Sequence, residues 1–335
     1  MINKRVILIA EIGQAHDGSL GIAHSFIDAL KNIDIDIIKF QTHIAKAESS
    51  EFEPFRINFS YEDNTRFDYW NRMSFSEDQW SGIKSHCEDV GVEFMSTPTC
   101  IAAVNLLENL NVLKYKVGSG DLSNLLLIKK ICDTKKPIYI SAGMSEKSDI
   151  KKTINFLSEN NNDYSLLACK SKYPTKVEDI NLNIIREYKK LYNCPIGFSD
   201  HSGSIFPSLG AVSLGAEIIE FHVTFDKKMF GPDSSSSLDL KKVKKLVKGV
   251  RMLEKIRENP DYGFKKSEMK NMQQIFEKSL CVNKNMKKGD KITFGDLECK
   301  KPSGMGLPAS KFEKVINRVL VNDKKQYEFI NESDI

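Results

Sequence analysis

The sequence predicts a (β/α)8 barrel followed by a small second domain, and two observations carry this prediction. Eight short, β-rich apolar runs alternate with longer amphipathic stretches, the pattern of a parallel sheet wrapped by helices. After about residue 276 the long stretches end, and short runs separated by turns take over. The expected boundaries are a barrel over residues 1–258, a linker over 259–276 and a small domain over 277–335, which suits a chain of 335 residues.

The eight expected strands follow one another at the spacing of βα units. They are Val6–Ala10, Asp36–Phe40, Glu93–Ser96, Lys114–Val117, Pro137–Ile140, Ser165–Cys169, Pro195–Phe198 and Glu217–Phe221. The expected helices are Ala23–Lys31, Glu77–Val90, Leu125–Cys132, Ser148–Leu157, Ile184–Leu191, Ile205–Leu214 and Asp239–Ile256. A doubly wound open sheet is the alternative, but no Gly-x-Gly-x-x-Gly follows the first strand, which weakens its dinucleotide-binding form.

Composition narrows the class of protein. A net charge of +4 is small for this length and gives no support for nucleic acid as a partner. The cysteines number seven, an odd count, and form no Cys-x-x-Cys pair, so we expect a reducing cytoplasm rather than a disulfide framework. The first apolar run, within Met1–Glu11, is too short for a signal peptide or a membrane span and is expected to be a buried strand.

The segment Thr42–Phe75 is long and polar, and it contains the aromatic cluster Phe67, Tyr69 and Trp70. Long loops of this kind in a barrel are often substrate lids. The alternative is a packing excursion that covers one end of the barrel. The sequence leaves both interpretations open.

Polar residues gather where the expected strands end, which is where barrel enzymes carry their active sites. Lys39 and Lys116 lie in otherwise apolar strands, where an unpaired lysine is costly. With the hydroxyls of Thr97, Ser119, Ser141 and Ser199 they form a set suited to a phosphate or carboxylate. The alternative is that each lysine reaches out of the barrel end or pairs with a structural acid.

Two histidines, His201 and His222, close neighbouring strands and predict a shared divalent ion, with manganese or magnesium favoured over a closed zinc site. Glu11 ends the first strand and is either an acid or base of the reaction or a structural partner of a lysine. His16 either lines the pocket, which we favour, or caps the first helix. Asp233 either binds sugar hydroxyls or belongs to a turn.

Several motifs, in order and spanning nearly the whole chain, resemble the sialic acid synthase family. They are Ala10–Gly13, Ile38–Thr42, Ser96–Pro98, Tyr115–Asp121, Ser141–Met144, Tyr173–Thr175, Gly197–His201 and Gly231–Asp233. The tail resembles the antifreeze-like (SAF) domain of that family at Lys278–Leu280, Lys287–Thr293 and Lys300–Gly304.

The resemblance implies an enzyme that condenses phosphoenolpyruvate with an N-acetylated hexosamine, and it implies roles by position. The implied catalytic residues are Glu11, Lys39, Lys116 and His222, and the implied ligands of the metal are His201 and His222. The implied substrate-binding residues are Gln41, Thr97, Ser119, Asp121, Ser141, Ser171, Tyr173, Ser199, Asp233 and Lys301. The implied metal is Mn2+, with Mg2+ or Co2+ as alternatives, and the implied assembly is a domain-swapped homodimer, with no nucleic acid and no membrane as partner.

The identity of the sugar stays open because Lys301 stands where the family usually has an arginine that reaches the sugar's acyl group. We favour N-acetylmannosamine, giving N-acetylneuraminate. The alternative is 2,4-diacetamido-2,4,6-trideoxymannose, giving N,N'-diacetyllegionaminate. Two further hypotheses are an aldolase or deoxy-heptulosonate type of barrel enzyme, with one lysine as a Schiff base, and a non-catalytic sugar-binding protein.

Overall fold

The structure, a computed structural model, describes residues 5–57, 59–258 and 267–335. The chain divides into two compact units, Met1–Asn259 and Pro260–Ile335. The predicted linker over 259–276 lies partly outside the described residues, since 259–266 are not among them. Its remaining part contains helix α11 (Lys270–Phe276).

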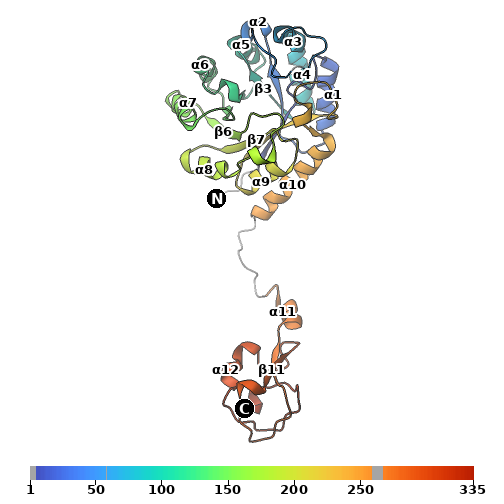
Figure 1. The fold of residues 1–335 in the computed structure, drawn as a ribbon, viewed down its shortest axis with the longest axis vertical. Helices are drawn as coiled ribbons and strands as arrows, with labels where there is room; N and C mark the ends of the chain where they lie inside the picture. Colours follow the sequence, from blue (N-terminus) through green and yellow to red (C-terminus); the bar gives the residue numbers. More distant parts are fainter. Residues whose placement is uncertain (1–4, 58, 259–266) are drawn as a thin grey trace. The chain divides into compact units, whose positions relative to one another are not determined.

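The first unit is a closed barrel of eight parallel strands (Figure 1). The strands are β1 (Ile7–Glu11), β2 (Ile37–Thr42), β3 (Glu93–Pro98), β4 (Tyr115–Val117), β5 (Ile138–Ser141), β6 (Tyr164–Cys169), β7 (Ile196–Asp200) and β8 (Ile218–Thr224). Strand β1 pairs with β2 on one side and with β8 on the other, which closes the sheet. The prediction of a (β/α)8 barrel is confirmed, and the open sheet is excluded because it has two free edges.

Most strands run one to three residues further than the sequence analysis expected. Glu11, Gln41, Thr97, Ser141, Ser199 and His222 therefore lie inside strands rather than after them. Their backbones are paired in register, as in Glu11 opposite Lys39 on β2 and opposite His222 on β8. The strand ends were predicted too early because polar side chains are typical of loops. In the structure the hydrogen bonds between the strands continue through these polar residues.

Helices surround the barrel in Figure 1. They are α1 (Leu20–Leu30), α4 (Glu77–Asp89), α5 (Ile101–Asn109), α6 (Leu125–Asp133), α7 (Lys147–Glu159), α8 (Asn183–Leu191), α9 (Phe206–Ser213) and α10 (Leu240–Glu258), with α2 (Ala45–Glu48) and α3 (Arg66–Met73) between β2 and α4. Helices α2, α3 and α5 were missed. Helix α3 begins at a capping box in which Thr65 and Asp68 exchange hydrogen bonds with each other's backbone, a local signal that the polar loop concealed.

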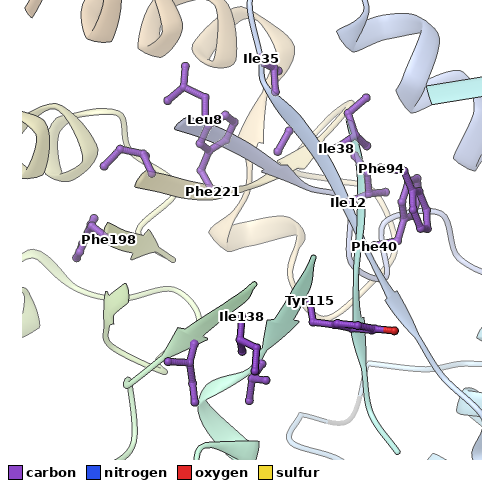
Figure 2. Close-up of a cluster of buried hydrophobic side chains, with 14 of the residues drawn as sticks. Leu8, Ile12, Ile35, Ile38, Phe40, Phe94, Tyr115, Ile138, Phe198 and Phe221 are labelled. Carbon is purple, nitrogen blue, oxygen red and sulfur yellow. The ribbon is translucent and has the colours of Figure 1, made fainter. Parts of the chain in front are cut away.

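The main hydrophobic core lies between the outer face of the barrel and the helices. Figure 2 shows Leu8, Phe40, Phe94 and Phe221 pointing from the strands toward this layer. A smaller apolar cluster fills the inside of the barrel, and it consists of Ile9, Ile37, Met95, Tyr139, Leu167 and Ile218. Successive side chains of a strand point to opposite faces, so six of the eight strands supply residues to both clusters.

The second unit contains a two-stranded antiparallel sheet of β10 (Ser279–Val282) and β11 (Leu297–Lys300), with one short helix, α12 (Phe312–Val315). Its core consists of Leu280, Val282, Met286, Ile292, Leu307, Val315, Leu320 and Ile330. The apolar run at Lys291–Phe294 does not form a strand, because its pairing is a single bridge from Lys291 to Val319. That this unit is an antifreeze-like domain stays a prediction. Across both units, none of the helices described is long and apolar enough to cross a membrane.

Candidate active site

A layer of charged and hydroxyl side chains lies inside the barrel, directly beyond the inner apolar cluster. The period of two along each strand places Glu11 after Ile9, Lys39 after Ile37 and Thr97 after Met95. The other strands add Lys116, Ser141, Ser199 and Glu220 to the same layer, and all seven of these side chains are buried. The barrel therefore changes from an apolar filling to a polar one at the carboxyl ends of its strands, where barrel enzymes place their chemistry.

Two lysines and two glutamates of this layer form one connected ion network. Lys39 Nζ lies 2.7 Å from Glu11 Oε2 and 3.1 Å from Glu220 Oε1, and it donates to Thr97 Oγ1 at 3.0 Å. Lys116 Nζ donates to Ser141 Oγ at 2.7 Å and lies 3.5 Å from Glu220 Oε2. Glu220 thus bridges the two lysines, whereas Glu11 pairs with Lys39 and not with Lys116.

The two lysines differ in how well their charge is balanced. Burial disfavours both ammonium groups, but at Lys39 the carboxylates of Glu11 and Glu220 outweigh burial and raise the pKa. Lys116 has only the more distant Glu220 carboxylate and lies near Lys39, so burial lowers its pKa. Burial would raise the pKa of Glu220, but the charges of Lys116 and Lys39 hold it low. An anion that binds beside Lys116 would supply the negative charge that this lysine lacks.

A cavity of about 530 Å3 opens over this layer. All the predicted site residues of the barrel line it: Glu11, Lys39, Gln41, Thr97, Lys116, Ser119, Asp121, Ser141, Ser171, Tyr173, Ser199, His201, His222 and Asp233. Its size is in the range of pockets that hold small-molecule substrates. Lys301 belongs to the other unit, where it is exposed and its Nζ lies 4.8 Å from the centre of the Phe276 ring.

The two predicted metal ligands lie side by side on the wall of the cavity. The ring centres of His201 and His222 are 5.3 Å apart. Burial, with the neighbouring His222, lowers the pKa of His201 to about 4, so its imidazole is neutral at physiological pH. Nδ1 of His201 is 3.0 Å from the carbonyl oxygen of Lys170 and donates to it, which leaves the lone pair of Nε2 free.

This arrangement fits an open divalent site that takes its remaining ligands from water or substrate. Within the described ranges there is no group of three or more His, Cys, Asp or Glu side chains that could hold a metal. Cys169 Sγ lies 3.6 Å from His201 Nδ1, but burial raises its pKa to about 11, so it is a protonated thiol and a poor ligand. Two imidazoles without a thiolate suit Mn2+ or Mg2+ better than a structural zinc site.

The segment between β2 and α4 reaches over the cavity. Its residues Arg56, Phe59, Arg66, Tyr69 and Trp70 all line the cavity. The Arg56 guanidinium lies 4.2 Å from the centre of the Tyr173 ring, and its Nη2 donates to Asp233 Oδ1 at 2.6 Å.

The same segment also has a small core of its own, formed by Ala45, Tyr69, Trp70 and Met73 with Phe67 packed against it. The segment therefore has features of both interpretations, since part of it lines the cavity and part of it packs on itself.

His16 lies outside the lining of the cavity, although we expected it to line the pocket. It is buried against Phe75, and its Nδ1 accepts from the backbone N–H of Gly18 at 3.1 Å, in the turn before α1.

Sequence reasoning missed Glu220, His43, Glu48 and Arg56 as parts of this site. Glu220 had a usable signal, since it stands two positions before His222 in a buried strand and so must point into the barrel. His43 and Glu48 had none, because their proximity depends on the turn into the short helix α2. Arg56 reaches Asp233 across 177 positions of sequence, a contact that spacing does not reveal.

A closed barrel with a buried pair of lysines, a hydroxyl-rich cradle and two neighbouring histidines at its carboxyl end defines a barrel enzyme for an anionic substrate. Residues 26–262 match the model of the NeuB family. The chain belongs to the NeuB family.

Relatives agree with this membership over nearly the full length. The chain is 31% identical to the N,N'-diacetyllegionaminic acid synthase of Campylobacter jejuni, over 98% of this chain and 100% of the relative. It is 33% identical to the N-acetylneuraminate-9-phosphate synthase of Homo sapiens, over 94% of this chain and 88% of the relative. The solved N-acetylneuraminic acid synthetase of Leptospira borgpetersenii superposes with a TM-score of 0.71 at 29% identity, over 81% of this chain and 91% of that one.

The protein is therefore an enzyme, a nonulosonic acid synthase that joins phosphoenolpyruvate to a sugar. This excludes the non-catalytic sugar-binding protein. A 3-deoxy-D-arabino-heptulosonate 7-phosphate synthase of Thermotoga maritima shares the fold, with a TM-score of 0.58, but only 12% of its residues are identical. That likeness concerns the fold alone and gives no support to the aldolase or heptulosonate hypothesis.

We expect Glu220→Gln to lower the free energy of unfolding by roughly 3–5 kcal/mol, because removing one partner leaves buried charge uncompensated. Denaturant unfolding measures this change. Glu93→Gln is the matched control, since Glu93 pairs with Lys114 at 3.0 Å in a partly exposed position and should matter far less. Equal losses in the two variants would contradict the charge network described above.

Proposed function

We propose that the sugar is N-acetylmannosamine and that the product is N-acetylneuraminate. The observation that supports this best is the lysine and hydroxyl cradle beside the His201–His222 pair, in one cavity large enough for two small substrates. The cradle suits the phosphate and carboxylate of phosphoenolpyruvate. The histidine side of the cavity then receives the sugar.

Phosphoenolpyruvate would bind with its charged groups against the layer inside the barrel. Lys116 supports this placement because its charge is only partly balanced by Glu220. Thr97, Ser119, Ser141, Ser171 and Ser199 supply hydroxyl donors around it. Water is largely excluded from this layer, and charge-assisted hydrogen bonds are stronger in such surroundings.

The reaction forms a carbon–carbon bond between the substrates and a carbon–oxygen bond to water, and it breaks the carbon–oxygen bond to phosphate. The methylene carbon of phosphoenolpyruvate attacks the aldehyde carbon of the open-chain sugar, whose oxygen takes up a proton and becomes a hydroxyl. Positive charge develops at the central carbon, where water adds and loses a proton. The added hydroxyl then loses its remaining proton and becomes the keto oxygen as phosphate leaves with the bridging oxygen. The lysines hold the departing phosphate, and alignment of two substrates lowers the barrier by up to about 7–11 kcal/mol.

Glu11 is placed to exchange a proton with a reacting group. Its Oε2 lies 2.7 Å from Lys39 Nζ, and its Oε1 accepts from Gln41 Nε2 at 2.6 Å, so the carboxylate is held at both oxygens. Glu11 also lines the cavity, where an attacking water or an aldehyde oxygen would come within its reach. Lys39 then has two tasks, since it fixes Glu11 and faces the anion.

His201 and His222 would hold a divalent ion, Mn2+ foremost, with Mg2+ or Co2+ as alternatives. Such an ion, when bound, polarises a carbonyl oxygen as a Lewis acid. Tyr173 restricts the orientation of both rings, because it packs on His201 with 4.2 Å between ring centres and lies 5.9 Å from His222. Asp233 Oδ2 lies 3.8 Å from His222 Nδ1 and would orient that ring.

Gln41, Tyr173 and Asp233 would contact the sugar. A phosphorylated sugar fits poorly, because the arginines over the cavity already have carboxylate partners. Arg56 pairs with Asp233 at 2.6 Å, and Arg66 lies 3.0 Å from Glu53.

A second candidate sugar is 2,4-diacetamido-2,4,6-trideoxymannose, giving N,N'-diacetyllegionaminate. The apolar lining by Ile57, Phe59 and Trp70 supports it, because this sugar has a second acetyl group and a methyl group to bury. The C. jejuni relative of that name, matched over its full length, supports it as well.

We further propose a homodimer in which each small domain, of the antifreeze-like type, closes the partner's cavity and brings Lys301 to the sugar. The small unit, taken alone, exposes Phe294 and Met305 by 70% and 54%, apolar surface that a partner would cover. The cytoplasm stays the proposed location, since all seven cysteines are free.

The proposal predicts phosphate release from phosphoenolpyruvate in the presence of Mn2+ and N-acetylmannosamine. The same assay with 2,4-diacetamido-2,4,6-trideoxymannose decides between the two sugars. Release that depends on one sugar identifies the substrate. Folded, metal-loaded protein that releases no phosphate with either sugar would contradict both assignments.

His222→Ala should abolish the metal-dependent reaction while leaving the fold intact, because it removes one of only two proposed ligands. Turnover is measured across a Mn2+ titration, and circular dichroism checks the fold. Phosphoenolpyruvate binding by calorimetry should survive, since the lysine cradle is unchanged. A variant with full metal-dependent turnover would overturn the metal assignment.

Lys301 gives a test of the swapped dimer. A Glu11→Gln chain and a Lys301→Ala chain should each be inactive alone, and mixing them with subunit exchange should restore activity, because one hybrid site then has both residues. No restoration after demonstrated exchange would contradict the swap. Lys301→Arg should change the preference among sugars more than the KM for phosphoenolpyruvate, and unchanged constants for every sugar would remove Lys301 from the site.

A further inference from the structure

A chain of hydrogen bonds leads from Glu11 away from the reacting groups to a buried histidine that has no role in the scheme above. Gln41 Nε2 donates to Glu11 Oε1 at 2.6 Å. Gln41 Oε1 lies 3.3 Å from His43 Nε2, and His43 Nδ1 lies 2.9 Å and 3.1 Å from the two carboxylate oxygens of Glu48. His43 is 6% exposed, and the side chain of Glu48 is 8% exposed.

One arrangement of donors and acceptors satisfies every contact of this chain when Glu11 and Glu48 are both carboxylates. The Glu11 carboxylate, paired with Lys39, can only accept, so the amide nitrogen of Gln41 faces it. The amide oxygen of Gln41 must then face His43, whose Nε2 has to donate. Glu48 at the other end is also an acceptor, so Nδ1 of His43 has to donate as well. In this arrangement both ring nitrogens of His43 act as donors, Nε2 to Gln41 and Nδ1 to Glu48.

The surroundings of His43 support a positive charge. The ring stacks on the indole of Trp70 with 3.9 Å between centres and 13° between planes, a favourable geometry for a cation on an aromatic face. The nearby His16 is neutral, because burial, followed by the charges of His43 and Arg72, lowers its pKa to about 3. Glu48 is thus the carboxylate that balances His43 directly.

We propose that His43 and Glu48 form a positioning pair that fixes the amide of Gln41 and, through it, the carboxylate of Glu11. The oxygen of Gln41 already accepts from His43 and from Gln14 Nε2 at 2.6 Å. One hydrogen of the Gln41 amide nitrogen then remains for the sugar. Gln41 would donate it to a hydrogen-bond acceptor such as a hydroxyl or carbonyl oxygen.

A glycine makes room for the inner end of this chain. Gly13 has a φ of +51°, and a Cβ there would lie 3.3 Å from Glu11 Oε1 and 3.4 Å from Gln41 Nε2. A side chain at this position would strain the backbone and press on the bond between the two groups. The glycine thus leaves room for the bond between Gln41 and Glu11, and the hydrogen bonds to Gln14 and His43 orient the amide.

The charge of His43 can be tested without any turnover. In 15N NMR spectra of the full-length protein near neutral pH, both ring nitrogens of His43 should show the shifts of protonated nitrogen, with the signal assigned by its loss in His43→Gln. In Glu48→Gln, which keeps the shape of the side chain but removes its charge, only one nitrogen should stay protonated. A neutral single tautomer in the wild-type protein would overturn the proposal.

The positioning role rests on the proposed function and is tested by kinetics. Glu48→Gln should lower kcat roughly 10–100-fold, as loss of an outer partner typically does, with the KM for phosphoenolpyruvate unchanged. Glu48→Asp should recover part of this loss, and Glu93→Gln, which breaks an ion pair at the far end of the barrel, should retain wild-type kinetics. Wild-type kcat in a folded Glu48→Gln variant would overturn the role. If the wild type itself releases no phosphate, the proposed function fails, and the NMR result still decides the charge of His43.

Discussion

The burial of two lysines and two glutamates in one layer inside the barrel is the constraint on which the rest of the site depends. Each of these charges alone would be costly in a dry interior, and the four are tolerated because they contact one another and nearby hydroxyls. The closed barrel brings them together, because the inward side chains of β1, β2, β4 and β8 meet at the same level inside it. The apolar layer beneath is needed as well, because it closes the site to water from the other end.

Around this layer each of three positively charged or basic side chains has its own carboxylate partner. Arg56 faces Asp233, Arg66 faces Glu53, and His43 faces Glu48. Lys116 is the exception in the charged layer, since it lies 3.5 Å from a carboxylate that it shares with Lys39. On the proposal made here, a bound anion would be attracted to Lys116, and the paired groups around it would orient neutral parts of the substrates by hydrogen bonding.

The barrel fold could be predicted from the sequence. Its strands and helices alternate regularly, and its strands end in polar residues, because every barrel of this type has the same backbone geometry. The sequence also named the barrel residues that the cavity brings together, from Glu11 on β1 to His222 on β8. It did not reveal Glu220, which was hidden in an apolar run, nor the pairing of Arg56 with Asp233, which depends on how a long loop folds back. Helix α3 was missed because its polar sequence gives little periodic signal, although Thr65 and Asp68 form a cap. Contacts within a strand follow from spacing, whereas contacts made by loops require the tertiary structure.

The most direct test of the account is a calorimetric measurement of phosphoenolpyruvate binding to Lys116→Met and Lys114→Met. Both lysines lie at the fourth strand and two positions apart, but only Lys116 lines the cavity, whereas Lys114 pairs with Glu93. The account predicts that Lys116→Met weakens binding by about 10-fold or more, the loss expected for a hydrogen bond to a charged group, and that Lys114→Met binds like the wild type. Equal affinities in all three proteins would contradict the claim that the buried lysine layer is the anion site.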